Sequence, residues 1–122
     1  AKCNEEQIRF YISQPAISKP AKAFMKEIGD MMAKRASLQR ETTELNQQTK
    51  RLSDEQARIR SNLQSLTSNQ PKELELRGKW VASLSANENQ LSECRGKLDE
   101  VGAQILKMDE SLARKIKDFR DE

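Results

Sequence analysis

Apolar residues recur at every seventh position in two long stretches of this chain, with a polar break between them. That spacing is typical of helices that pack side by side in a coiled coil. The break, residues 67–72, reads TSNQPK, residue types that favour turns and helix starts. The pattern predicts an all-α fold, a long antiparallel two-helix coiled-coil hairpin, because so short a connection returns the second helix along the first. The first ladder is Phe24, Met31, Leu38, Leu45, Leu52, Ile59 and Leu66, and the second is Leu84, Leu91, Leu98, Ile105, Leu112 and Phe119.

The expected organisation is one hairpin domain. Helix one should span residues 19–66, the turn 67–72 and helix two 71–120, after an extended segment and connector at 1–18. A turn centred near residue 70 would place Phe24 near Ile116 and Leu52 near Glu88, to within a few residues.

Residues 7–12 read QIRFYI, an alternation of apolar and polar positions that favours a strand with one buried face. No second strand pattern follows, and a lone strand is not stable in water. The segment therefore pairs with a sheet of a longer parent protein or across an oligomer, or else it is a disordered leader. The chain begins with AKCNEEQ and without an initiator Met, as a mature product or an excised fragment would.

Beside its ladder, helix one has a second stripe of positions with the same seven-residue spacing. This stripe is apolar at its ends and polar in its middle. Such a seam is weaker than one of Leu and Ile, but it can fix the register and limit the number of helices that associate. In helix two, Leu74, Val81 and Ile116 widen the seam at its ends, and Gly96 and Gly102 either relieve crowding or soften the helix. The stripe of helix one is Ile28, Arg35, Thr42, Thr49, Gln56 and Leu63.

The composition agrees with a thin seam rather than a compact core, since only 35% of the residues are hydrophobic and 34% are charged. Disorder is the alternative for so polar a chain, but disordered segments have no reason to keep a seven-residue repeat. Residues 19–70 carry 10 basic and 6 acidic side chains, and residues 71–122 carry 10 and 11. This asymmetry favours pairing of the two helices with each other.

The two cysteines, Cys3 and Cys94, are too few for a disulfide framework. The layout separates them by about half the hairpin, beyond the roughly 7 Å that a disulfide spans between Cα atoms, so we expect no bridge between them. Cys94 is expected to be a small buried residue of the seam, and a reactive or oligomer-linking thiol is the alternative.

The sequence offers no constellation of catalytic residues. Histidine, the usual general base, is absent. Carboxylates occur as neighbouring pairs at 54–55, 99–100 and 109–110. Neighbours on a helix point in different directions, so we expect these side chains to lie on the solvated surface and not to form an acid–base pair. We expect no enzyme activity, no cofactor and no metal site. No apolar run approaches the length of a membrane-spanning helix, so no membrane insertion is expected.

Two surfaces are candidates for contact with a partner. At the open end of the hairpin, the apolar face is wider than one partner helix can cover. We expect a protein there, either the chain's own parent domain or a second copy. This surface consists of Phe24, Met25, Ile28, Met31, Met32, Ile116 and Phe119.

The second surface lies toward the tip, where arginines could contact a phosphate backbone as the arm of a larger enzyme. Acidic Asp54 and Glu55 interrupt this cluster, and a phosphate-binding face is normally uninterrupted. Nucleic acid is therefore the less favoured partner. The tip residues are Arg51, Arg58, Arg60 and Trp80.

Four stretches of the chain also resemble a known group of proteins. They are residues 11–18 (YISQPAIS), 54–63 (DEQARIRSNL), 76–80 (LRGKW) and 84–88 (LSANE). Together they are similar to the C-terminal part of bacterial proteins of unknown function sometimes labelled mucoidy-inhibitor-like. The likeness covers residues 8–95 loosely, and its motifs are moderately specific. Gly78 and Lys79 separate Arg77 from the aromatic residue that follows it directly in the group, and Asn87 stands where Gln is usual.

In that group a β-rich domain ends in a strand, a connector and a helical hairpin. The resemblance therefore implies that the strand at 7–12 belongs to a sheet outside this chain. It also implies an exported or cell-envelope protein of bacteria. It transfers no catalytic residues.

Overall fold

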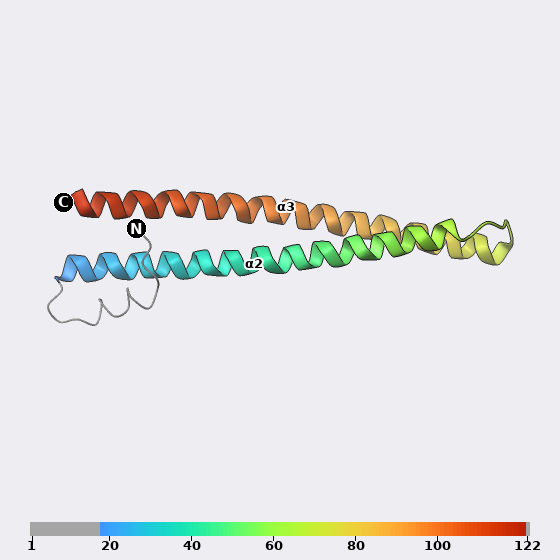
Figure 1. Ribbon diagram of the computed structural model, residues 1–122, viewed down its shortest axis with the longest axis horizontal. Coiled ribbons are helices and arrows are strands. Elements are labelled where there is room, and N and C mark those ends of the chain that lie inside the picture. Colours follow the sequence, from blue (N-terminus) through green and yellow to red (C-terminus); the bar gives the residue numbers. More distant parts are fainter. Residues whose placement is uncertain (1–17, 122) are drawn as a thin grey trace. The chain divides into compact units, whose positions relative to one another are not determined.

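The described part of the chain folds as an all-α helical hairpin of two helices. The computed structural model describes residues 18–121, with α2 at Lys19–Gln64 and α3 at Pro71–Asp121 joined by residues 65–70 (Figure 1). The described residues contain no strand, and the two helices run antiparallel, as the two ladders predict. The expected extended segment at 1–17, with its strand at 7–12, lies outside the described residues.

Helix α2 begins with a side-chain cap. The backbone N–H of Ala21 donates to Ser18 Oγ at 3.3 Å, and that of Lys22 donates to the Ser18 carbonyl at 3.0 Å. Serine in this position satisfies one of the amide groups that the first turn of a helix leaves without a partner. Pro20 fits this turn because it has no N–H to satisfy.

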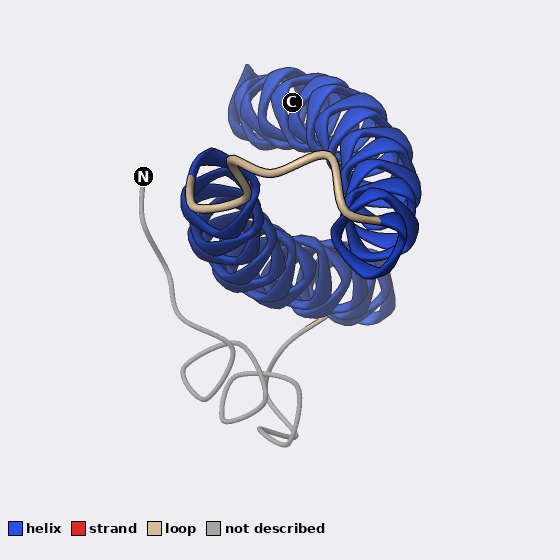
Figure 2. Cartoon of the chain, turned by 90° about the vertical axis from the view of Figure 1, so that its right-hand side faces the viewer, coloured by secondary structure: helices blue, strands red, loops and turns tan. Residues whose placement is uncertain are grey.

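The loop between the helices is braced by residues of α3. Glu73 accepts a hydrogen bond from the backbone N–H of Ser68 at 2.8 Å, and Arg77 donates to the Leu66 carbonyl at 2.8 Å. Ser68 Oγ also accepts from the backbone N–H of Gln70 at 3.0 Å. The loop passes from the end of α2 to Pro71, which begins α3 (Figure 2). These contacts satisfy backbone groups that lie between the two helices.

The hairpin divides into two compact units. The terminal unit combines the described residues up to Thr42 with those from Val101 onward, and the loop unit is residues 43–100. Each unit contains a segment of both helices.

The terminal unit is held by a narrow apolar seam. Ile28, Leu38 and Val101 are buried, and the rings of Phe24 and Phe119 stack with centroids 4.0 Å apart and planes 2° from parallel. The expected register placed Phe24 near Ile116 to within a few residues, and the ring that stacks on Phe24 is Phe119, three residues further on. The spacing of apolar residues gives the alignment no more finely than this, because it does not specify the geometry of the loop.

The seam of the loop unit contains one buried polar residue. Its buried apolar side chains are Leu45, Ile59, Leu91 and Cys94, and Asn87 lies among them at 4% exposure. Cys94 is a free buried thiol, as expected. Cys3 lies outside the described residues.

The threonines of the seam are satisfied within their own helix. Thr42 Oγ1 donates to the Leu38 carbonyl at 3.1 Å, and Thr49 Oγ1 donates to the Leu45 carbonyl at 2.8 Å. A threonine bonded in this way presents a methyl group to the seam without an unpaired hydroxyl.

The exposed glycines of α3 do not relieve crowding. A Cβ atom built at Gly96 or Gly102 would meet no other heavy atom within 4 Å, beyond the neighbouring helix backbone. The prediction that these glycines relieve crowding in the seam is therefore wrong. The alternative prediction, that they soften the helix, remains.

Candidate interaction surfaces

Part of the predicted contact surface at the open end is used inside the terminal unit. Ile28 is buried, and Phe24 and Phe119 stack on each other across the seam. Ile28 is thus unavailable to a partner, whereas Phe24 and Phe119 contact each other and remain partly exposed. The remaining members, Met25, Met31, Met32 and Ile116, are half-buried.

Two ion pairs also join the helices of the terminal unit. Arg35 Nε donates to Asp109 Oδ1 at 2.5 Å and Arg35 Nη2 to Asp109 Oδ2 at 3.2 Å. Lys115 Nζ lies 2.5 Å from Glu27 Oε1. The hydrogen bond from Arg35 holds the pKa of Asp109 below its ordinary value, and the carboxylate raises the pKa of Arg35 in turn. Sequence reasoning missed both pairs, because neither follows a spacing along one helix.

A shallow groove opens beside the same seam. It has a volume of about 380 Å³, and apolar side chains of Met31, Leu38 and Met108 reach it. Lys34 and Lys107 stand along it, with Gln104 and Ser111 completing the lining. The lining of this groove contains no carboxylate and no thiol.

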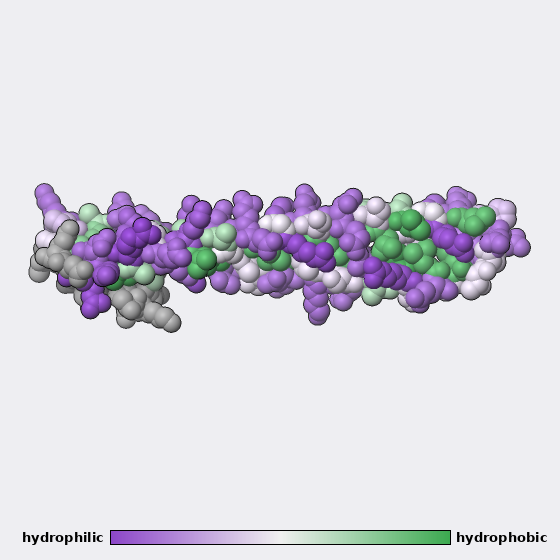
Figure 3. Space-filling model, turned by 90° about the horizontal axis from the view of Figure 1, so that it is seen from above, coloured by the Kyte–Doolittle hydropathy of each residue, from purple (hydrophilic) through white to green (hydrophobic). Residues whose placement is uncertain are grey.

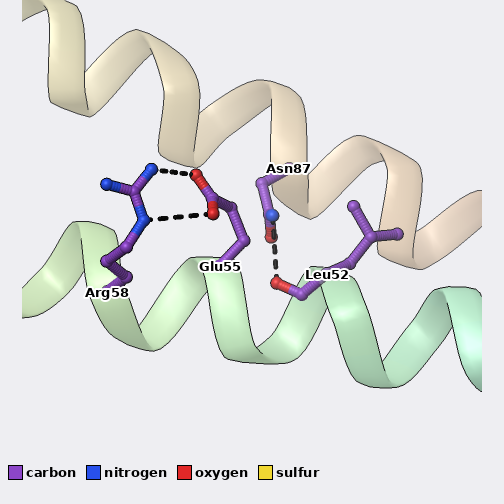
Figure 4. A network of polar contacts seen from close by, with 4 residues as sticks. All are labelled: Leu52, Glu55, Arg58 and Asn87. Carbon is purple, nitrogen blue, oxygen red and sulfur yellow. Dashed lines mark hydrogen bonds and ion pairs between the residues drawn. The ribbon is translucent and has the colours of Figure 1, made fainter.

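Toward the loop, Arg58 is held by two neighbours. Its Nη2 lies 2.5 Å from Glu55 Oε1 and its Nε 3.2 Å from Oε2, one turn back on α2 (Figure 4). The guanidinium also lies over the Trp80 ring, 5.5 Å from its centroid. The hydrogen bond from Arg58 lowers the pKa of Glu55, and the carboxylate raises the pKa of Arg58.

The other two predicted tip arginines have different surroundings. Arg60 lies 4.0 Å from Glu88, whose carboxylate also accepts a hydrogen bond from the Gln56 side chain. Arg51 is exposed. The structure thus brings Arg58 and Trp80 together but sets carboxylates beside two of the three arginines. An uninterrupted basic stripe, which phosphate contact favours, is not formed by these residues.

The largest exposed apolar side chains lie elsewhere than predicted. In the loop unit, Leu74 is 48% exposed and Val81 is 52% exposed, and Leu76 is exposed on another side of α3. The prediction that Leu74 and Val81 widen the seam is therefore wrong. They lie seven residues apart and so share a flank of α3. Hydrophobic surface is visible near the loop end (Figure 3). Leu106 is 61% exposed in the terminal unit.

The described residues also bear on metal binding and on membrane spanning. Within residues 18–121, no group of three or more Cys, Asp or Glu side chains is placed to hold a metal ion. Neither described helix is long and apolar enough to cross a membrane.

Comparison of the chain with known protein families, with curated proteins and with solved structures gives no significant match. A function must therefore be argued from the surfaces described above.

Proposed function

We propose that this chain is a non-catalytic coiled-coil element that serves as a spacer and as a contact surface for another protein. That partner is a second copy or the chain's own parent domain. The observation that carries the proposal is the exposure of Leu74 and Val81, at 48% and 52%, on one flank of α3. Large apolar side chains that share a face are more typical of contact sites than scattered ones.

The charges around this flank suit a protein partner better than a nucleic acid. The loop unit contains nine basic and nine acidic residues, so it has no net charge to attract a polyanion. Arg58 and Arg60 lie beside Glu55 and Glu88. An apolar contact of this kind depends little on salt, whereas phosphate binding depends on it steeply.

The proposal includes the setting that the sequence resemblance implies. The hairpin would extend from a β-rich domain of an exported bacterial protein, and residues 7–12 would complete a sheet of that domain.

The test is the mass of the full chain in solution, measured by sedimentation equilibrium over a concentration series at low and moderate salt. We expect a mass that rises with concentration and is insensitive to salt. The double variant Leu74→Ser/Val81→Ser should lower the association. Leu106→Ser, which removes an exposed leucine of the other unit, is the matched control and should leave it unchanged.

The alternatives give different results. A monomer at every concentration would exclude self-association and leave the parent domain as the partner. Binding of RNA or DNA that weakens steeply as salt rises would contradict the proposal and support the alternative, a nucleic-acid-contacting arm.

A further inference from the structure

The apolar seam of the loop unit does not by itself define one alignment of its helices. Leu45, Leu52 and Ile59 on α2 and Leu84, Leu91 on α3 follow the same seven-residue spacing. Sliding one helix by seven residues therefore places apolar layers on apolar layers again.

The loop is long enough to permit such a displacement. Seven helical residues correspond to about 10 Å along the axis. Packed helices lie about 8–10 Å apart, and residues 65–70 could span about 20 Å when extended. Displacement would break the contacts of Glu73 and Arg77 with the loop, but the length of the chain does not prevent it. The register therefore needs a feature that does not repeat.

Asn87 is such a feature. It is the buried polar residue of the described seam, at 4% exposure, and its Nδ2 donates across the seam to the Leu52 carbonyl at 3.0 Å (Figure 4). Its Oδ1 has no hydrogen-bond partner among the described residues. A buried amide with one unpaired acceptor is less stable than an apolar side chain in that place, so stability does not explain it.

The backbone carbonyls of α2 differ in whether they have a lone pair free to accept a hydrogen bond from Asn87. A carbonyl has two lone pairs, and inside a helix the N–H four residues later uses one. At Leu45 the hydroxyl of Thr49 takes the other, at 2.8 Å. Four residues after Leu52 stands Gln56, whose amide donates to Glu88 instead. The Leu52 carbonyl is thus left open to Asn87.

Displacement by seven residues toward Leu45 removes this match. Asn87 would then meet the Leu45 carbonyl, which Thr49 already uses, and an unpaired amide in the seam is strongly disfavoured. Displacement the other way would bring Asn87 to the Ile59 carbonyl, where no hydroxyl competes because Leu63 stands four residues later. Asn87 therefore discriminates against one displaced alignment, and the contacts of Glu73 and Arg77 with the loop oppose both.

We infer that Asn87 and Gln56 together hold the loop unit in the observed register against the displaced alignment in which Asn87 meets Leu45. Asn87 supplies the donor across the seam. Gln56 leaves the Leu52 carbonyl free, because a threonine at position 56 would donate its hydroxyl to that carbonyl. The inference concerns the hairpin itself and holds whichever partner the exposed flank binds.

The test measures the distance between one spin label on each helix by double electron–electron resonance. Labels on Lys50→Cys and Ala82→Cys lie at exposed positions of the loop unit and are offset along the axis. The full chain carries Cys3→Ser and Cys94→Ala in every sample, so that only these sites are labelled. The parent should give one distance.

Two substitutions should each release the register. Asn87→Leu removes the donor, and Gln56→Thr introduces a hydroxyl that competes for the Leu52 carbonyl as Thr49 competes at Leu45. Each should add a second distance population, displaced by up to about 10 Å, while circular dichroism shows that helix content is retained. Gln56→Val is the matched control, since it has the shape of threonine without the hydroxyl. It should keep the single distance.

The inference is overturned by a single unchanged distance in either Asn87→Leu or Gln56→Thr. It is equally overturned if Gln56→Val gains a second distance, since loss of the contact with Glu88 would then be the cause. A variant with reduced helix content is replaced by Asn87→Met, whose side chain is also apolar and unbranched, and the same criterion applies to it.

Discussion

Arg35 reaches across the seam of the terminal unit to hold Asp109 with both arms of its guanidinium. Nε lies 2.5 Å from Oδ1 and Nη2 lies 3.2 Å from Oδ2. The two side chains are 39% and 45% exposed, so water screens their attraction. Arg35 occupies a stripe position between Ile28 and Thr42, and the long stem of arginine covers the seam while its charge stays outside.

The first prediction concerns the free energy of this pair. In a double-mutant cycle of Arg35→Ala and Asp109→Ala, we expect a coupling of about 0.5–1 kcal/mol, the upper range for exposed pairs because the contact is bidentate. Urea unfolding followed by circular dichroism measures it. Strictly additive effects of the two substitutions would show that the pair contributes nothing to stability.

The second prediction is a pH dependence from the same pair. The pKa of Asp109 is held below its ordinary value of 3.8 by the hydrogen bond from Arg35. A carboxyl with a depressed pKa in the folded state contributes stability above its unfolded pKa, and loses it as pH falls through the folded value. The stability difference between the parent and Asp109→Asn should thus be constant above about pH 5 and shrink below about pH 4. A difference that does not change down to pH 2 would contradict this assignment.

The third prediction concerns the glycines of α3. Because a Cβ atom at Gly96 or Gly102 meets open space, alanine fits without displacement of neighbours. Each Gly→Ala substitution should raise the free energy of unfolding by about 0.5–1 kcal/mol, chiefly by restricting the unfolded chain. Thermal unfolding measures the effect. A lowered midpoint in either variant would mean that glycine serves a contact not formed within the hairpin alone.

The sequence predicts the helices well and their alignment less well. The seven-residue ladders identify both helices because burial along one stripe imposes that period. They do not specify how the loop sets one helix against the other, so they place Phe24 near Ile116, three residues short of Phe119. The bond between Arg35 and Asp109 was missed because the two residues lie 74 positions apart, and no spacing along one helix links them. Leu74 and Val81 were assigned to the seam because spacing identifies a shared face but not which face α2 covers.

The fourth prediction concerns the stacked rings at the open end. Phe119→Leu keeps most of the apolar volume and loses the stacking with Phe24, so it should lower stability by about 0.5–1.5 kcal/mol. Phe119→Ala also removes buried surface and should cost about 2–4 kcal/mol, less than a fully buried ring because Phe119 is half-exposed. Urea unfolding ranks the two variants. Equal effects would show that stacking adds nothing to burial.

The last prediction uses Trp80, the chain's single tryptophan, as a reporter of its contact with Arg58. The guanidinium covers one face of the indole and is itself oriented by Glu55. In Arg58→Ala, water replaces the guanidinium, and Trp80 fluorescence should shift to longer wavelength. Glu55→Gln should give a smaller shift, since it weakens the orientation of Arg58 and leaves the cation in place. Arg51→Ala is the control, because the described residues show no ring contact for Arg51. Identical spectra for Arg58→Ala and Arg51→Ala would mean that Arg58 does not cover Trp80 in solution, which would leave both side chains free to meet a partner at this end of the hairpin.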